Sequence, residues 1–173
     1  MRSTTNWGQV KPSAGGEMLP VGGHVATITA AQDTNFKSGA GCLKVSFTVT
    51  EGDAANMTGE FMQGYEGKSE GMFRGFLDSV AASNPGKFSA ETFANDERKL
   101  VGMKVGVIVQ ERYYTNDAGE DKTWTEVRRT EDVAKIRSGR FTLPKPRDQR
   151  TQPPGVSAAQ EQAAAAYGSD VPF

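Results

Sequence analysis

The segment VGMKVGVIVQERYYTNDAGEDKTWTEVRR, residues 101–129, decides the expected fold. Two runs of β-type residues flank a polar loop at residues 116–120. Valine- and isoleucine-rich runs on either side of an Asn/Asp/Gly cluster are typical of a β-hairpin. Tyr113, Tyr114 and Trp124 accompany basic residues there, which suits single-stranded nucleic acid because rings stack on bases and cations contact phosphates. The alternative interpretation is that these rings only cover a face of the sheet.

Three more strands are expected before the hairpin, at residues 24–32, 42–50 and 56–65. The clearest is 42–50, CLKVSFTVT, whose strict alternation predicts one buried face and one face open to water or a ligand. Residues 69–83 predict the one helix, because apolar residues recur there at spacings of three and four. These residues are Met72, Phe73, Phe76, Leu77 and Val80.

This order of elements predicts a mainly β fold, a five-stranded OB-fold barrel with one helix between strands three and four, although other small barrels share the order. We expect a flexible N-terminal arm at residues 1–17 and the folded domain at 18–143. Residues 144–173 are rich in Pro, Ala and Gln and are expected to be a disordered tail. Trp7 in the arm would dock either on the domain or on nucleic acid.

The charge is unevenly distributed although the net charge is only −1. Residues 122–150 contain nine Lys or Arg against four Asp or Glu, and no Lys or Arg follows residue 150. A basic segment before a weakly acidic tail suits a protein that binds a polyanion. An open sheet edge would also allow homo-oligomers, but the sequence does not define the oligomeric state.

Enzymatic chemistry has little support in this sequence. Cys42 is the only cysteine and His24 the only histidine, so neither an internal disulfide nor a zinc site made from these residue types is expected. Cys42 is expected to be buried and His24 to lie on the surface or at a strand edge. The acidic pairs at 96–97 and 131–132 are expected to face solvent rather than bind Mg²⁺. We therefore expect no catalytic residues, no metal and no cofactor.

No signal-peptide pattern opens the chain and no run is long enough to span a bilayer. The expected location is the cytoplasm, or the host cytoplasm for a phage-encoded protein, without a membrane partner.

The final residues, Asp170-Val171-Pro172-Phe173, resemble the C-terminal tip of single-stranded DNA-binding (SSB-type) proteins of bacteria and phages. In that family an acidic run precedes an aliphatic residue, proline and a terminal phenylalanine. Here Asp170 is the only acid at the tip. The resemblance implies that this tip recruits replication, recombination or repair proteins, since a terminal ring can enter an apolar pocket while a basic residue binds the carboxylate.

The first half of the expected domain is similar to a phage-associated group of OB-like SSB proteins. The matching motifs are Leu19-Pro20-Val21-Gly22, Lys37-Ser38-Gly39, Leu43-Lys44-Val45-Ser46-Phe47 and Glu51-Gly52, in that order. The resemblance implies sequence-independent binding and protection of single-stranded DNA.

The expected DNA-binding face combines rings and cations. The candidate stacking residues are Tyr113, Tyr114 and Trp124 with Phe36, Phe61 and Tyr65, and the candidate phosphate-binding residues are Lys37, Lys44, Lys104, Arg112, Lys122, Arg128 and Arg129. Alternation places Tyr113 and Tyr114 on opposite faces of their strand, and Phe36 would act either as a stacking residue or as a lid. Two alternatives remain: an OB-like protein-interaction adaptor with little DNA affinity, and a metal-dependent nuclease.

Overall fold

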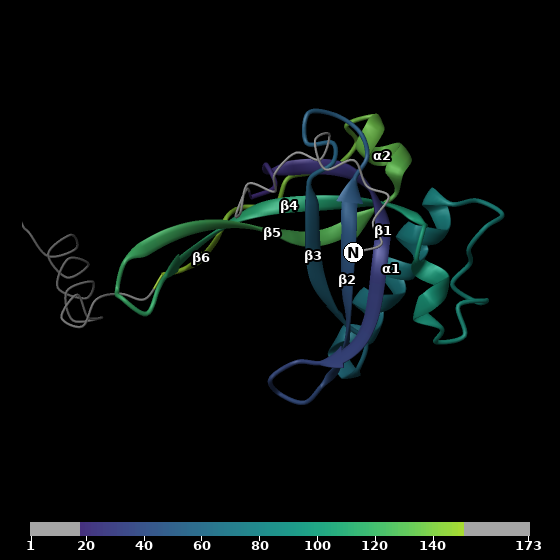
Figure 1. Ribbon diagram of the computed structural model, residues 1–173, viewed down its shortest axis with the longest axis horizontal. Helices are drawn as coiled ribbons and strands as arrows, with labels where there is room; N and C mark the ends of the chain where they lie inside the picture. The colour runs from purple at the N-terminus through teal and green to yellow at the C-terminus, as the bar shows by residue number, and fades with distance from the viewer. Residues whose placement is uncertain (1–17, 151–173) are drawn as a thin grey trace, which may run out of the picture.

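Six strands form one sheet in the computed structural model, which describes residues 18–150 (Figure 1). They are β1 (Gly22–Asn35), β2 (Gly41–Val49), β3 (Thr58–Gly64), β4 (Lys104–Thr115), β5 (Asp121–Glu131) and β6 (Arg147–Gln149). The first five follow the spatial order β3-β2-β1-β4-β5, and every neighbouring pair is antiparallel. The expected mainly β fold is confirmed. The short β6 was not expected, and it pairs in parallel with β4.

The inner strand β2, between β3 and β1, shows why the sheet has a core face. Val45, Phe47 and Val49 are at most 1% exposed, whereas Lys44, Ser46 and Thr48 between them are only half-buried. The alternation predicted for this strand is therefore confirmed. It sends every second side chain into one hydrophobic core shared with the neighbouring strands and the helix.

The predicted helix is α1 (Glu70–Ser83), which lies between β3 and β4 and follows the short 3-10 helix η1 (Gly67–Ser69). Its buried residues are Phe76, Leu77 and Val80, and Phe73 packs against the same core. Met72 departs from the prediction, since it is 56% exposed. Met72 lines an opening between β3 and β5 rather than the core, which leaves its side chain uncovered.

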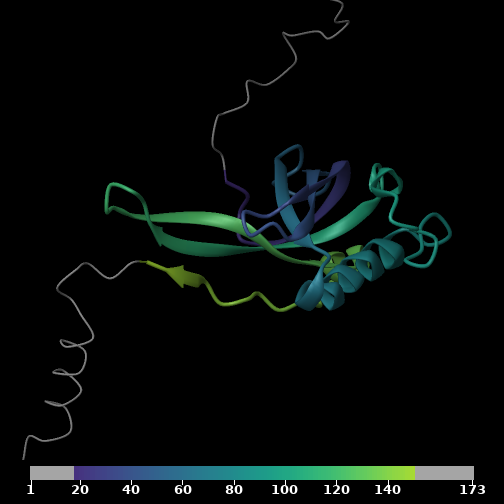
Figure 2. The ribbon, with the colours of Figure 1, turned by 90° about the horizontal axis from the view of Figure 1, so that it is seen from below.

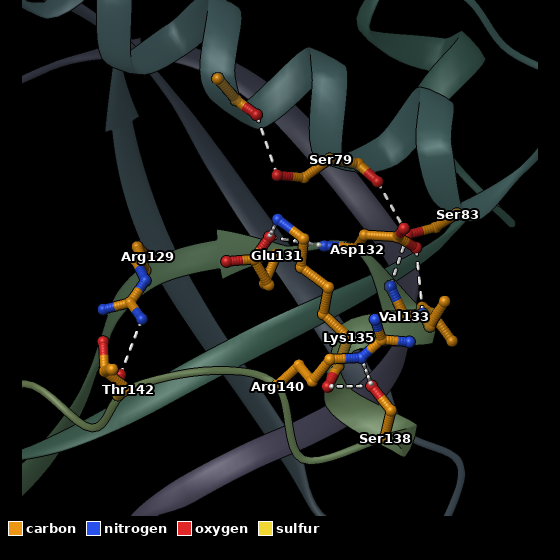
Figure 3. A network of polar contacts seen from close by, with 12 residues as sticks. Ser79, Ser83, Arg129, Glu131, Asp132, Val133, Lys135, Ser138, Arg140 and Thr142 are labelled. Carbon is orange, nitrogen blue, oxygen red and sulfur yellow. Dashed lines mark hydrogen bonds and ion pairs between the residues drawn. The ribbon is translucent and has the colours of Figure 1, made fainter.

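The helix α2 (Val133–Arg137) follows β5 and covers the face of the β1–β4 pair opposite the core. The 3-10 helix η2 (Glu97–Leu100) precedes β4 and contributes Leu100 to the core itself. A Cβ atom at Gly106 would lie 2.5 Å from Ile136 of α2, so glycine is what lets α2 approach β4 this closely. Val133 N donates to Ser83 Oγ at 3.0 Å, which joins α2 to the end of α1 (Figure 3).

The sheet is not closed into a barrel by hydrogen bonds. β3 and β5 come into contact at one place, yet no ladder pairs them. Beyond Val109 the β4–β5 hairpin leaves β1 and projects as an arm, with α1 at the far end of the molecule (Figures 1 and 2). We call the part of β4 and β5 from residue 110 to residue 126 the arm.

The described sheet runs past the expected domain boundary at residue 143, because β6 at Arg147–Gln149 joins β4. The predictions for residues 1–17, including Trp7, and for the tip at 170–173 lie outside the described residues. Across residues 18–150, no helix is long and apolar enough to cross a membrane.

Candidate nucleic-acid interface

A groove of about 550 Å³ lies where the edges of β3 and β5 face each other without pairing. We call it the β3–β5 groove. It is lined by Phe36, residues 60–64 of β3, Ser69 and Met72 at the start of α1, Arg112, residues 126–130 of β5, and Arg147. The missing ladder between β3 and β5 therefore leaves a hollow lined by both apolar and charged side chains.

One wall of the groove is apolar. Phe36, Met62 and Met72 come from the β1–β2 loop, β3 and α1, and they are 37%, 43% and 56% exposed. A Cβ at Gly64 would lie 3.1 Å from the Phe36 ring, so the bare glycine lets this ring rest on β3. Three exposed apolar side chains converging from separate elements form a surface on which a flat apolar group could pack.

The opposite wall is cationic. It carries Arg112 on β4, Arg128 and Arg129 on β5, and Arg147 on β6. Arg128 makes no ion pair within residues 18–150. Arg129 donates from Nη2 to the carbonyl oxygen of Thr142 at 2.7 Å and so holds the segment that leads to β6 (Figure 3). Three cations predicted from sequence are thus brought together, with a fourth from the unexpected strand.

Two carboxylates moderate this positive charge. Glu60 on β3 pairs with Lys44 at 3.2 Å. Glu126 on β5 accepts a hydrogen bond from Gln110 at 2.9 Å and faces Arg112 and Arg147. The groove therefore keeps a positive excess that is smaller than its arginine content alone indicates.

Trp124 lies in a hollow that continues the groove. Glu60, Glu126 and Val127 line both hollows, and the second also contains Leu19 and Thr58. Trp124 is 44% exposed and stands opposite Arg112 in the β4–β5 ladder, so the two share one face of the arm. The ring is accessible to a ligand that leaves the groove along the arm.

The two tyrosines of the arm point to opposite faces, as predicted from alternation. The Arg112 guanidinium lies 5.2 Å from the Tyr114 ring centre, and the Arg150 guanidinium lies 5.5 Å from that of Tyr113. The Tyr113 hydroxyl donates to Glu111 at 2.6 Å, which raises the pKa of Tyr113. The face with Arg112 and Tyr114 is therefore basic and aromatic, whereas Tyr113 stands beside a carboxylate.

Two predicted stacking residues, Phe61 and Tyr65, make tertiary contacts within the domain. The Phe61 ring contacts Phe47 and Phe76, with ring centres 6.1 and 5.8 Å apart, although it also borders the groove. The Tyr65 hydroxyl donates to Asp33 at 2.7 Å, which raises the pKa of Tyr65 to about 12. These positions depart from the expectation of free stacking surfaces, because tertiary contacts already use both rings.

The other predicted cations are dispersed. Lys104 lies at the start of β4, where its backbone N–H and carbonyl oxygen form hydrogen bonds with the Asn84 side chain. It does not line the groove. Lys122 is on the arm and pairs with Glu120 at 2.9 Å. Lys37 is exposed in the β1–β2 loop next to Phe36, and Lys44 is neutralised by Glu60. None of these four lysines lines the β3–β5 groove.

Arg147, Met62 and Met72 were not predicted as site residues. Arg147 follows Pro144 and Pro146, which indicated the end of the domain rather than a strand. The alternating basic residues Lys145 and Arg147 were the only local signal. Met62 faces the groove because β3 is an edge strand, and that is a property of the assembled sheet.

The residues considered for catalysis have structural partners. The His24 ring nitrogen Nε2 lies 2.7 Å from the carbonyl oxygen of Pro20, and Cys42 is fully buried, as predicted. Burial raises the pKa of the Cys42 thiol. Asp132 accepts from Ala134 N at the start of α2, and Glu131 pairs with Lys135 (Figure 3). Within residues 18–150, no three His, Cys, Asp or Glu side chains gather as a metal site.

The class that the fold and groove define is a mainly β domain with an amphipathic groove at an open sheet edge. No family model matches the chain, and a comparison with curated proteins finds no significant match.

Proposed function

We propose that this protein binds single-stranded DNA without sequence specificity, through the β3–β5 groove and the basic face of the arm. We also propose that the domain is a partly open barrel of the OB type. The order of five strands, the antiparallel pairing and the position of α1 between β3 and β4 support this assignment.

The observation that carries the proposal is the contrast between the two walls of the groove. Phe36, Met62 and Met72 form one wall, and four arginines form the other. A single strand has the matching asymmetry, with bases on one side and phosphates on the other. A duplex hides its base faces and presents phosphates along both strands, so it would leave the apolar wall without a partner.

The tip at Asp170–Phe173 is proposed to recruit proteins of DNA replication, recombination or repair. Its support is the sequence resemblance to SSB-type tips and the ability of a terminal ring with a free carboxylate to fill an apolar pocket. We propose no catalytic activity for the domain.

The direct test is a fluorescence titration with poly-dT at several salt concentrations. Trp7 and Trp124 are the two tryptophans, so a Trp7→Phe variant reports Trp124 alone. We expect quenching of Trp124 and an affinity that falls as salt rises, with a slope of about −0.7 for each phosphate contacted. Absence of both quenching and binding at low salt would overturn the proposal. Equal affinity for a duplex would show that the apolar and cationic walls of the groove do not select single-stranded DNA.

A pair of charge variants tests whether the groove is the binding face. Arg128→Gln removes a groove cation that has no ion pair within the described residues, so we expect the salt slope to decrease by about 0.7. Lys87→Gln is the matched control, because Lys87 is exposed in the loop after α1 and does not line the groove. If both variants behave like the wild type, the DNA lies on another face.

An adaptor with little DNA affinity is the second candidate. Glu126 inside the groove favours it, because this acid faces Arg112 and Arg147 and offsets part of their charge. Deleting residues 170–173 separates the two. A DNA-binding protein keeps or gains affinity for poly-dT and loses its protein partners, whereas an adaptor has no such affinity before or after the deletion.

A further inference from the structure

We propose that Arg112 and Arg147 form a phosphodiester-binding subsite in the β3–β5 groove, and that Glu126 occupies this subsite when no nucleic acid is bound. The inference rests on the proposed function and deepens it. It assigns a binding role to Arg147 and to β6, and a competing role to Glu126.

The first support is the position of the two arginines. Arg112 on β4 is the ladder partner of Arg147 on β6, and both line the groove. Neighbouring strands lie about 4.8 Å apart, so two side chains at the same level of the ladder can reach one anionic group. The Tyr114 ring, 5.2 Å from the Arg112 guanidinium, holds that side chain over the arm. The two cations therefore form a pair before any ligand arrives.

The second support is that Glu126 satisfies this pair poorly. Arg112 Nη1 lies 3.5 Å from Glu126 Oε2, and Arg147 Nη1 lies 3.8 Å from Glu126 Oε1. Charge-assisted bonds between guanidinium and carboxylate are normally about 2.7–2.9 Å long. The short bond of Glu126, 2.9 Å, is the one that it accepts from Gln110. The carboxylate is thus anchored by Gln110 and only loosely shared by the arginines.

The third support is an unused donor. Arg112 Nε is shielded from solvent and has no hydrogen-bond partner, and it is the one such side-chain atom in the described part of the chain. A guanidinium offers donors in a fixed fork that matches two oxygens of one anion. A ligand that accepts from both Nε and a terminal nitrogen of Arg112 would satisfy this group.

A phosphodiester fits better than a second carboxylate. It carries one negative charge shared by two non-bridging oxygens, which can accept from the two arginines at once while Glu126 stays with Gln110. The apolar wall at Met62 and Phe36 faces this pair across the groove, which favours a chain with alternating charged and flat groups over free phosphate.

The test compares two arginines of the same terminal segment. Arg147→Gln removes one half of the subsite. Arg150→Gln is the matched control, because Arg150 pairs with Asp148 and lies over Tyr113, on the opposite face of the arm from Arg112. We expect Arg147→Gln to reduce the salt slope for poly-dT by about 0.7 and to weaken binding about fivefold to tenfold at low salt, and Arg150→Gln to change neither.

Glu126→Gln distinguishes a ligand subsite from an ion pair that only supports the fold. The variant keeps a partner for Gln110 and removes the competing charge, so we expect it to bind poly-dT more tightly than the wild type. If Arg147→Gln and Glu126→Gln both weaken binding equally, the triad is structural and the inference is overturned.

The outcomes also separate this inference from the proposed function. If the wild-type protein binds poly-dT and the Arg147→Gln variant shows the same dependence of affinity on salt, the proposed subsite is overturned and the proposed function stands. If wild-type protein does not bind poly-dT at low salt, the function itself fails. If polyglutamate binds in an Arg147-dependent manner while poly-dT does not bind, the groove takes an acidic peptide and both proposals are overturned.

Discussion

The same two strands, β4 and β5, behave differently in the body of the domain and in the arm. In the body, Val105, Val107 and Val109 are at most 1% exposed and pack in the core. In the arm, Arg112, Tyr113 and Tyr114 are only half-buried and contact charged groups. The comparison indicates that apolar burial holds the body together, whereas the arm has side chains available for a ligand.

The change between the two regions occurs where β1 stops pairing with β4. Gly22 is the ladder partner of Val109, and past this point β6 takes the neighbouring position at Arg112. A three-residue strand covers less of β4 than β1 does. The arm therefore keeps a polar face next to the groove, and we expect substitutions there to affect binding more than folding.

The largest expected effect is in the body. Phe76→Ala should lower the free energy of unfolding by about 3–5 kcal/mol, because the ring is 1% exposed and contacts Phe61 and Phe73. Urea denaturation measures it. Tyr113→Ala in the arm is the comparison and should cost much less. Equal losses at the two positions would break the distinction between body and arm.

The next effect concerns a buried polar link in the body. Asn84 is 7% exposed, and its side chain donates to the carbonyl oxygens of Val80 and Lys104 and accepts from Lys104 N. Asn84→Ala leaves these backbone groups without partners, which should cost about 1–3 kcal/mol of unfolding free energy. Tyr113→Phe removes a part-buried side-chain hydrogen bond of the arm, which links no buried backbone groups, and is expected to cost less than Asn84→Ala by the same assay. A neutral Asn84→Ala would show that water replaces the link.

The arm should show the reverse behaviour. Trp124→Ala should weaken poly-dT binding by about 1–3 kcal/mol, the value of one lost stack, and leave the unfolding midpoint nearly unchanged because the ring is 44% exposed. Binding and thermal unfolding are measured on the same sample. A large loss of stability with unchanged affinity would assign Trp124 to the body instead.

The smallest effect is a pH dependence at the edge of the body. The Arg137 guanidinium binds Glu51 through Nε at 3.1 Å and lowers the pKa of Glu51 below its ordinary value. The unfolded chain then binds a proton more readily than the folded protein. The contribution is present above the ordinary glutamate pKa of about 4.3 and is lost as the pH falls through the lower folded-state pKa.

We expect this contribution to be below about 1 kcal/mol, because the pair is exposed and screened by solvent. Glu51→Gln should therefore lose less stability than the wild type when denaturation at neutral pH is compared with denaturation well below pH 4.3. Identical losses would show that the pair between the β2–β3 turn and α2 contributes nothing measurable.

Local pattern was sufficient for much of the fold. The alternation at residues 42–50 predicted β2, and the spacing of Phe73, Phe76 and Val80 predicted α1. The hairpin loop was also readable, because the Asn116 side chain accepts from the backbone of Ala118 and Glu120 and Gly119 has a φ of +78°. These features depend on residues close together in sequence.

The candidate site could be predicted only in part, because it depends on contacts between residues far apart in the sequence. Sequence predicted Arg112, Arg128, Arg129 and Phe36 as separate binding residues, but nothing local indicated that they share a groove. Lys44 and Glu60 lie sixteen positions apart and meet only because β2 pairs with β3. The hydrogen bond from the Tyr65 hydroxyl to Asp33 likewise joins residues that are far apart in the sequence.

By itself, the sequence determined strands β1 to β5, the helix α1, the hairpin turn and the residue types suited to a polyanion, because side-chain periodicity and turn chemistry act over a few residues. The tertiary structure decided that β3 and β5 stay unpaired, that β6 brings Arg147 beside Arg112, and that Met62 and Met72 face the arginines. These are contacts between segments far apart in the chain, and packing of the whole sheet sets them.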